Sequence, residues 1–486
     1  MLKQIKPIIK NTAIYAMGNI SGKLVGFILL PYYTEKLSVA EYGIFGTIDA
    51  TFQLIVAIAG LNLTVAFVRW YWDKDIHARQ KSIYFTTLTF VSCIALLVFI
   101  GFYPISHAVS NLLFNTDDYS RLVRLMALAA SLEIICVVPA SLCKVQSKAA
   151  LYTRNLIIRL FIVLTCTLFT VVFLNRKVEG IYEAQIAGSI VYLLLFVPLT
   201  LKNCALKFEY DILKKMLNYS FPIVISSAFN VILVVTDRYT LNFIAGQESV
   251  GIYSLAHKFA NLLKIVIVIS VQSALLPVIF KMVNDPGVKR FLSNTMTYFT
   301  LGLMFFVIGL SLFGQEIIKL LSRNPEFWDS WKIIPILSFA VVFSMMKDNA
   351  VYCLQIVKRT KMIAGITMFV MLLNIALNIL LVPMMGSVGA ALSTLFAQII
   401  FFAAMLYFSN RYYPVDYEYR KIVVAIGAGL LICIAPFIIC DWSLTWRLCI
   451  KTALLASYPV ILYLLFFNDS TLSLNSYFTN YRQNLP

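Results

Sequence analysis

Long apolar stretches separated by short polar connections run along almost the whole chain. A membrane-spanning helix needs about 20 predominantly apolar residues, and about fourteen segments meet that requirement. These segments are residues 11–33, 42–68, 82–103, 121–142, 154–174, 180–200, 219–244, 250–280, 291–313, 333–356, 362–383, 387–408, 421–440 and 448–467. The longest connections, about 104–120 and 314–332, are too short to fold alone. The pattern predicts an all-α polytopic membrane protein.

Composition agrees with this class. Hydrophobic residues make up 60% of the chain and charged residues 13%, whereas a soluble domain averages about 25% charged residues. The N-terminal segment resembles a signal peptide, but Lys23 interrupts its apolar run, which continues to Tyr33 without a small-residue cleavage motif. We therefore expect it to be retained as the first helix.

The basic residues between the spans predict the orientation. One set of alternating segments holds 24 Lys and Arg residues and the other set holds 7. Because cytoplasmic loops carry the excess of Lys and Arg, both termini are predicted to be cytoplasmic. Topology thus explains most of the net charge of +17, and no nucleic-acid partner is expected.

The chain also repeats itself. Residues 38–45 (SVAEYGIF) resemble residues 247–253 (QESVGIY), with Gly43 and Gly251 at equivalent positions. Two further weak matches, after the fourth span and at the sixth span of each half, occur at almost the same offset. An even number of spans per repeat gives two parallel halves, which normally enclose a central site. We expect a six-helix lobe at 1–205, a second at 206–410, and two extra helices at 411–486.

Charged residues also lie within the predicted spans or at their edges. Such a residue costs several kcal/mol unless it faces protein or water, so it indicates a functional site. Nine are basic and four are acidic: Lys23, Arg121, Arg124, Arg159, Arg238, Lys258, Lys264, Lys347 and Lys451, with Asp49, Glu133, Asp237 and Asp348. This surplus predicts a cationic membrane interior.

The spacing of these residues predicts where some of them point. Ser254, His257, Asn261, Lys264 and Gln272 follow one face of an otherwise apolar helix, which indicates a wet lumen or a bundle interior. Asp49 shares a face with Gln53, and it either carries a proton or pairs with a lysine; Glu133 poses the same alternative. Asp237 and Arg238 are adjacent and so point about 100° apart, which argues against a mutual pair.

No chemistry of an enzyme or a metal site is indicated. The nine cysteines are scattered singly, without the spacing of a disulfide framework or a metal site. The chain lacks a P-loop, a GxSxG or HExxH motif and a large outer loop. We expect a protein that is not an enzyme and has no cofactor.

Several short motifs carry a family resemblance that covers nearly the whole chain. They are Tyr219-Ser-Phe-Pro222, Asp237-Arg-Tyr239, Val250-Gly-Ile-Tyr253 with Lys258, Tyr42-Gly-Ile-Phe45 and residues 386–391 (GSVGAA). The chain resembles the polysaccharide transporters, the O-antigen and capsule repeat-unit flippases, of the multidrug/oligosaccharidyl-lipid/polysaccharide exporter superfamily. This resemblance implies fourteen helices in two six-helix lobes plus two, and translocation of undecaprenyl-pyrophosphate-linked oligosaccharides to the outer leaflet of a bacterial cytoplasmic (inner) membrane.

The resemblance also implies roles for the charged residues and partners for the protein. The candidates for substrate binding are Lys23, Arg159, Arg238, Lys258, Lys264 and Lys347, and those for coupling to a proton or sodium ion are Asp49, Glu133, Asp237 and Asp348. Further partners would be membrane lipids and polysaccharide polymerase machinery. A lipid II flippase would need a similar cationic cavity, whereas a drug and toxin extruder would favour an acidic one. A membrane polysaccharide polymerase or ligase would carry a large outer loop.

Overall fold

A computed structural model describes residues 25–73, 78–283, 285, 287–439 and 442–466. Its helices in the first half are α2 (Leu30–Lys36), α3 (Val39–Ala59), α4 (Leu63–Tyr71), α5 (Gln80–Phe114), α6 (Ser120–Val145), α7 (Ala149–Thr167), the π-helix η2 (Leu168–Phe173) and α8 (Lys177–Asn203). Those that follow are α9 (Tyr210–Ile244), α10 (Gly246–Leu263), the π-helix η3 (Lys264–Ile269), α11 (Ser270–Lys281), α12 (Val288–Leu321), the 3₁₀-helix η4 (Pro325–Lys332), α13 (Ile334–Ile356), α14 (Thr360–Tyr412), α15 (Tyr419–Ile438) and α16 (Leu444–Phe466). No β-strand occurs among the described residues.

The structure confirms the predicted all-helical membrane architecture. Twelve helical segments within the described part of the chain are long and apolar enough to cross a membrane. The 53-residue α14 is two helices that meet at Gly386, whose φ of 54° and ψ of −130° break the helical path. It therefore provides the two spans predicted at 362–383 and 387–408. Most of the first predicted span, including Lys23, lies outside the described residues.

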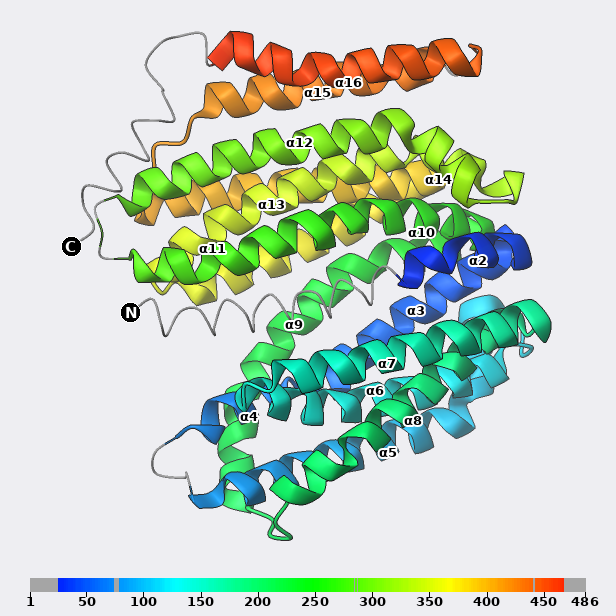
Figure 1. Cartoon of the computed structure of the whole chain (residues 1–486), viewed down its shortest axis with the longest axis vertical. Helices are drawn as coiled ribbons and strands as arrows, with labels where there is room; N and C mark the ends of the chain where they lie inside the picture. Colours follow the sequence, from blue (N-terminus) through cyan, green and yellow to red (C-terminus); the bar gives the residue numbers. More distant parts are fainter. Residues whose placement is uncertain (1–24, 74–77, 284, 286, 440–441, 467–486) are drawn as a thin grey trace.

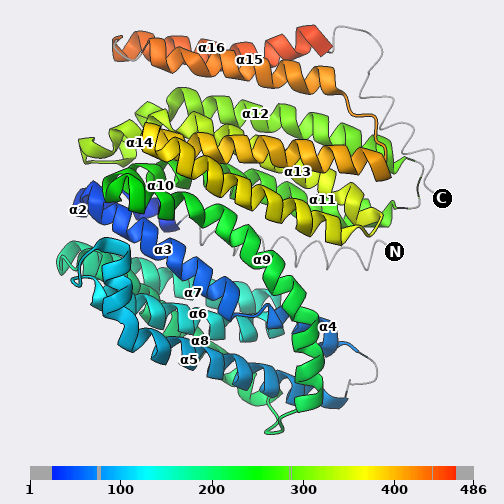
Figure 2. The same ribbon diagram turned by 180° about the vertical axis from the view of Figure 1, so that it is seen from behind.

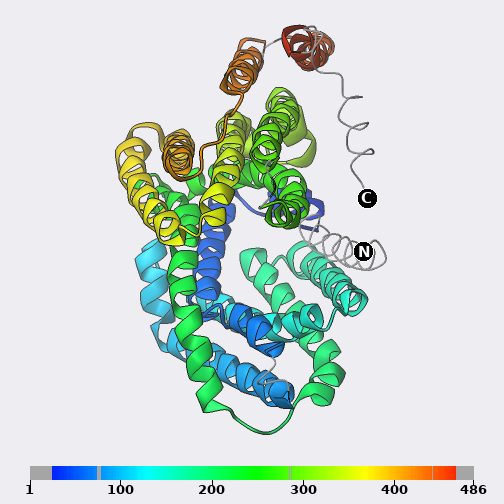
Figure 3. The ribbon, with the colours of Figure 1, turned by 90° about the vertical axis from the view of Figure 1, so that its left-hand side faces the viewer.

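The helices form two groups with α3 and α9 between them (Figure 3). One group contains α5, α6, α7 and α8, and the other contains α10, α12, α13 and α14. Helices α15 and α16 pack against α12 at the edge of the second group. The two groups converge toward the end where α2 ends and α3 and α10 begin, and they spread apart toward the opposite end (Figures 1 and 2).

The converging end is held by a close crossing of α3 and α10. A Cβ atom on Gly43 would overlap the Gln247 carbonyl oxygen, and one on Gly251 would overlap that of Val39. Only glycine allows this approach of two backbones, and the two glycines are those at equivalent repeat positions. Ser38 starts α3 with a capping box, because its Oγ accepts from the Glu41 amide and the Glu41 carboxylate accepts from the Ser38 amide.

A second pair of equivalent positions also has the same local structure. Ser147 after α6 and Lys358 after α13 both have positive φ, 55° and 59°. In both turns the next amide bonds back five residues, from Lys148 to Cys143 and from Arg359 to Leu354, at 2.8 and 2.9 Å. Such bonds satisfy orphan carbonyl groups at a helix end. The repeat seen in the sequence thus extends to the caps of these helices.

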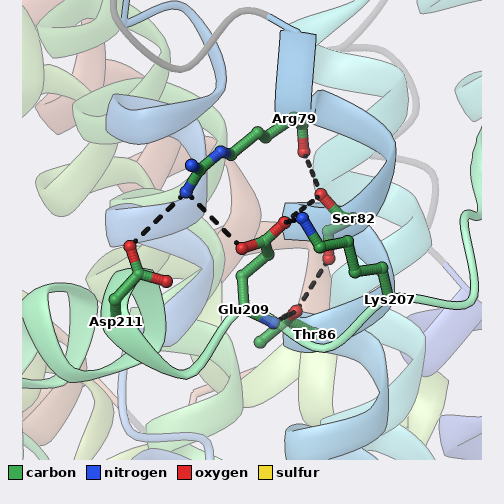
Figure 4. Close-up of polar contacts among 6 residues, drawn as sticks. All are labelled: Arg79, Ser82, Thr86, Lys207, Glu209 and Asp211. Atoms are coloured by element: carbon green, nitrogen blue, oxygen red, sulfur yellow. Dashed lines mark hydrogen bonds and ion pairs between the residues drawn. The ribbon is translucent and has the colours of Figure 1, made fainter.

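At the spreading end, a polar cluster fixes the start of α9 on α5 (Figure 4). The carboxylate of Glu209, which is 5% exposed, accepts from Ser82 Oγ at 3.2 Å and lies 3.0 Å from Lys207 Nζ. Arg79 Nη1 lies 3.5 Å from both Glu209 and Asp211. This cluster ties the first turn of α9 to the first helix group, while the C-terminal part of α9 packs on α10 and α14.

Candidate functional site

A cavity of about 540 Å³ lies between the two helix groups. Residues of α3, α7, α8, α9, α10, α13 and α14 line it. Six of the ten site residues predicted from the sequence are among them: Asp49, Arg159, Asp237, Arg238, Lys258 and Lys264. The remaining lining is a mixture of apolar side chains and neutral polar ones, the latter including Gln53, Gln185, Ser254, Asn261, Ser344, Thr394 and Gln398.

The described lining carries more positive than negative charge. Four of its side chains are Lys or Arg and two are carboxylates. The polar face predicted on α10 is present, because Ser254, His257, Asn261 and Lys264 all line the cavity. Gln272, predicted on the same face, instead donates to Asp348 Oδ2 at 2.9 Å. The π-helix η3 begins at Lys264 and widens the helical turn, so a face extrapolated from α-helical spacing is lost beyond it.

Arg238 lines this cavity and has only long contacts with its neighbours. Its Nη1 lies 3.5 Å from Asp49 Oδ2 and its Nη2 lies 3.4 Å from His257 Nδ1. Both distances exceed the usual 2.7–3.2 Å of an N–H hydrogen bond. The Nε group is buried without a hydrogen-bond partner among the described residues. The sequence left two roles open for Asp49, a proton carrier or the partner of a lysine. In the structure its carboxylate contacts Arg238 and also accepts a hydrogen bond from Gln53 Nε2 at 2.7 Å.

Asp237 forms no ion pair with Arg238, as predicted, and lies among neutral hydrogen-bond donors. Its Oδ2 accepts from Thr394 Oγ1 at 2.5 Å and from the Tyr253 hydroxyl, and its Oδ1 accepts from Asn378 Nδ2 at 2.7 Å. Asn378 also contacts Asn374 on the same helix. The Asp237 residue is 2% exposed. Hydrogen bonds from neutral groups stabilise a buried carboxylate, but they leave its charge uncompensated.

Glu133 and Arg159 form an ion pair within the first helix group. Arg159 Nη2 contacts the Glu133 carboxylate and donates to Ser189 Oγ at 3.0 Å. The guanidinium also lies over the Tyr192 ring, 5.2 Å from its centroid. Arg159 lines the cavity, whereas Glu133 lies behind it. Of the two alternatives for Glu133, the structure shows a partnered carboxylate, with an arginine as the partner.

Lys347 and Asp348 lie outside the lining. Lys347 Nζ is 2.5 Å from Asp348 Oδ1 and stands 4.8 Å from the centroid of Phe401. Lys264 lines the cavity and makes no hydrogen bond or ion pair with another described residue. Lys258 lines it as well, with its Nζ 5.4 Å from the Tyr33 ring centroid. The described part of the chain contains no cluster of three or more His, Cys, Asp or Glu side chains that could hold a metal.

Two partners of Asp237 could not be identified from the sequence. Thr394 lies 157 residues away and Tyr253 belongs to the next helix. Asn374 and Asn378 are four residues apart in the sequence and therefore share one face of a helix, but this spacing does not identify the helix that the face contacts. The packing of α9, α10 and α14 determines which hydroxyl groups contact Asp237.

Comparison with known proteins places the chain in a family. Residues 8–283, more than half of the chain, match the family described as polysaccharide biosynthesis protein. An uncharacterized membrane protein of Methanocaldococcus jannaschii is 21% identical over 86% of this chain and 87% of its own length. A protein of the Lsg locus of Haemophilus influenzae is 23% identical over 56% of this chain and 66% of that protein.

Solved structures share the fold. The lipid II flippase MurJ in an inward closed conformation superposes with a TM-score of 0.73 and 17% identity, over 93% of this chain and 99% of that one. A multidrug resistance MATE transporter in an inward-facing conformation gives a TM-score of 0.64 and 14% identity, over 83% and 97%. The chain is thus a multi-pass membrane protein that belongs to the polysaccharide biosynthesis protein family, with the fold of the multidrug/oligosaccharidyl-lipid/polysaccharide exporter superfamily.

Proposed function

We propose that this protein is a flippase that moves polyprenyl-pyrophosphate-linked oligosaccharides across the cytoplasmic membrane during synthesis of a cell-surface polysaccharide such as O-antigen, capsule or exopolysaccharide. The observation that carries the proposal is the cationic, polar cavity between the two helix groups. A pyrophosphate needs Arg and Lys donors, and sugars need neutral hydrogen-bonding groups. The cavity lining has both, with Gln, Asn, Ser and Thr side chains beside its four cations.

The binding of the pyrophosphate would begin at Arg238 and Lys264. The long contacts of Arg238 with Asp49 and His257 and its unpartnered Nε leave donor capacity for an anion. Lys264 adds a charge on the neighbouring helix. Arg159 and Lys258 extend the cationic surface, and Lys23 and Lys347 remain candidates from the sequence. The cavity suits a pyrophosphate with a few sugars, and the long polyprenyl chain would stay in contact with lipid.

The arrangement of the lobes supports alternating access. The groups spread apart at the end that holds the basic connections, such as the segment between α8 and α9. If these connections are cytoplasmic, as the distribution of Lys and Arg predicts, this conformation receives substrate from the cytoplasm and both termini lie there. Closure of that end and separation of α3 from α10 would then release the substrate outside. On this proposal the lobes are residues 1–205 and 206–410, with 411–486 as an addition.

Asp237 is the carboxylate that we assign to a coupling cation. Asp49, Glu133 and Asp348 each contact a cationic side chain, whereas the described contacts of Asp237 are with neutral groups. Sodium prefers oxygen ligands, as other hard cations do. The Thr394 hydroxyl, the Asn374 and Asn378 amide oxygens and the carboxylate could provide them. A proton could also bind to Asp237.

A lipid II flippase is the second candidate. The similarity to the MurJ structure extends over almost the whole chain, and lipid II carries the same pyrophosphate chemistry. The fold of the MATE transporters also fits, but a cationic lining disfavours organic cations. The sugar portion therefore separates the first two candidates, and the charge of the substrate separates both from drug extrusion.

The test is transport into proteoliposomes of short-chain polyprenyl-pyrophosphate oligosaccharides, with lipid II and a cationic drug as competitors. We expect transport by the wild type, competition by pyrophosphate lipids only, and a large loss in Lys264→Gln. Lys332→Gln is the matched control, because Lys332 lies in η4, outside the described lining, and its Nζ pairs with Asp329. Transport of the cationic drug without transport of the oligosaccharide would overturn the proposal.

A further inference from the structure

One chain of side-chain contacts joins the buried carboxylate to the cavity arginine. The Tyr253 hydroxyl donates to Asp237, and the Tyr253 ring stacks on the His257 ring with centroids 5.9 Å apart and an interplanar angle of 25°. His257 Nδ1 contacts Arg238 Nη2, and Arg238 continues to Asp49 on α3. This series of contacts starts at Asp237 on α9, passes through Tyr253 and His257 on α10, and ends at Asp49 on α3.

The chemistry of arginine fixes the state of His257. A guanidinium can only donate hydrogen bonds, so His257 Nδ1 accepts and its ring proton is on Nε2. The imidazole is therefore neutral and holds one of the Arg238 nitrogens. This contact is one of the two that keep the guanidinium at the cavity wall, the other being Asp49.

Helix α10 is the element that contacts both functional side chains. Asp237 and Arg238 are neighbours on α9, but Asp237 faces α10 and α14, whereas Arg238 faces α10 and α3. Tyr253 and His257 are four residues apart and so stand one above the other on α10. A displacement of Tyr253 along or around the helix therefore moves His257 with it.

The surroundings of α10 provide two discrete constraints on such a displacement. At its start, Gly251 packs against the backbone of α3, and Ser254 packs against Gly46. Seven residues after His257 the helix becomes the π-helix η3. A π-helical turn inside an α-helix is rare and is frequently found at functional sites. The segment between these two points contains Tyr253 and His257.

We propose that Tyr253 and His257 are positioning residues that transmit occupancy of the Asp237 site to Arg238, and so adjust the affinity of the cavity for the substrate pyrophosphate. A cation at Asp237 competes with the Tyr253 hydroxyl for the same carboxylate oxygens. The freed tyrosine shifts the stacked His257 and releases Arg238 toward the cavity. The inference rests on the proposed function, in which Asp237 binds the cation and Arg238 binds the pyrophosphate.

The test measures the coupling between the two sites. The affinity of the purified full-length protein for farnesyl pyrophosphate is determined with sodium and with choline at equal ionic strength, and in a second series at two pH values. The ratio of the two affinities is the coupling factor, and coupling of this kind typically amounts to about 5–150-fold. The ratio is independent of a uniform loss of affinity that a merely structural defect would cause.

Three substitutions separate the links. Tyr253→Phe keeps the stacked ring and removes the bond to Asp237, and His257→Leu removes the acceptor for Arg238; both should reduce the coupling factor to about one. His257→Gln supplies a new acceptor and should retain most of the coupling. Tyr239→Phe is the matched control. It removes a tyrosine hydroxyl of α9 that bonds to Thr51 at 2.8 Å and takes no part in the contacts between Asp237 and Arg238.

The possible results distinguish this inference from the proposed function. Wild-type coupling that persists in both Tyr253→Phe and His257→Leu would overturn the inference and leave the proposed function standing. An equal loss of the coupling factor in Tyr239→Phe would also overturn the inference, since the effect would then not depend on the contacts of Tyr253 and His257. A wild-type protein that does not bind the probe, or whose affinity responds to neither cation, would overturn both.

Discussion

Glu133 in the first helix group and Asp237 at the second are both carboxylates at membrane depth, but their surroundings differ. Glu133 contacts an arginine, which in turn contacts Ser189 and Tyr192. Asp237 is bonded by Tyr253, Asn378 and Thr394, none of which carries a charge. The first carboxylate has a cationic partner, whereas the described hydrogen bonds of the second come from neutral groups only.

This difference separates a structural role from a functional one. An ion pair satisfies both of its members, so it has little to gain from an additional cation. A buried carboxylate without a cationic partner gains a large electrostatic stabilisation when a cation or proton binds. On the proposed function, ion binding therefore belongs to the region of α9, α10 and α14, and structural support of a cavity arginine belongs to α6, α7 and α8.

The largest expected effect is on cation-driven transport in Asp237→Asn. The amide keeps the size of the side chain but removes the charge that attracts the cation, so transport driven by a cation gradient should fall about tenfold or more. Glu133→Gln, the equivalent change in the other group, should retain the cation dependence. Measurement of uptake against sodium and proton gradients compares the two. Equal loss of cation dependence in both variants would remove the distinction between them.

The next effect concerns stability in the first helix group. Arg159→Leu leaves Glu133 without its partner and should destabilise the fold by about 3 kcal/mol. The double variant Glu133→Leu/Arg159→Leu removes both charges and should recover most of that loss. Unfolding of the purified protein in detergent, followed for both single variants and the double variant, gives the coupling energy. An additive double variant would show that the two side chains do not depend on each other.

A smaller effect is expected where the two groups meet. Gly251→Ala places a methyl group against the Val39 carbonyl, and overpacking of this kind costs about 1–3 kcal/mol. Gly302→Ala is the matched control, because no atom lies within 4 Å of its added Cβ, and alanine is favoured over glycine in a helix by about 0.5–1 kcal/mol. Opposite shifts in unfolding temperature should result. A destabilised Gly302→Ala would contradict the packing argument.

The smallest effect is expected at the surface of the converging end. Arg323 contacts Glu35, and the two side chains are 63% and 36% exposed. Exposed ion pairs contribute about 0–1 kcal/mol, and salt screens them. Arg323→Ala should therefore change the unfolding free energy by less than about 1 kcal/mol, with a smaller difference at high salt. A loss that exceeds that of Gly251→Ala would make this pair the main contact of the closed end.

The sequence alone was sufficient for the spans and for the repeat. Apolar length identifies a transmembrane helix because the bilayer cannot satisfy an open backbone, and a span is present at each position predicted within the described residues. The prediction of 42–68 as one span is wrong in its end, because α3 ends at Ala59 and the positive φ of Leu61 and Asn62 separates it from α4. The cavity-lining face of α10 was also predicted, because α-helical periodicity is fixed by the backbone. The prediction is wrong only for Gln272, which contacts Asp348 and lies beyond a π-helix that the local sequence does not reveal.

The partners of the charged residues were decided by tertiary structure. The sequence supplied nine basic and four acidic candidates, but periodicity gives only the face of a helix and not the helix that it meets. Packing pairs Glu133 with Arg159 and Lys347 with Asp348, and it brings Thr394 to Asp237 across 157 residues. The number and kind of membrane helices thus follow from local chemistry, which each segment carries in itself. Whether a buried carboxylate has a cationic partner, as Glu133 does, or only neutral partners, as Asp237 does, depends on several helices at once, and only their packing determines it.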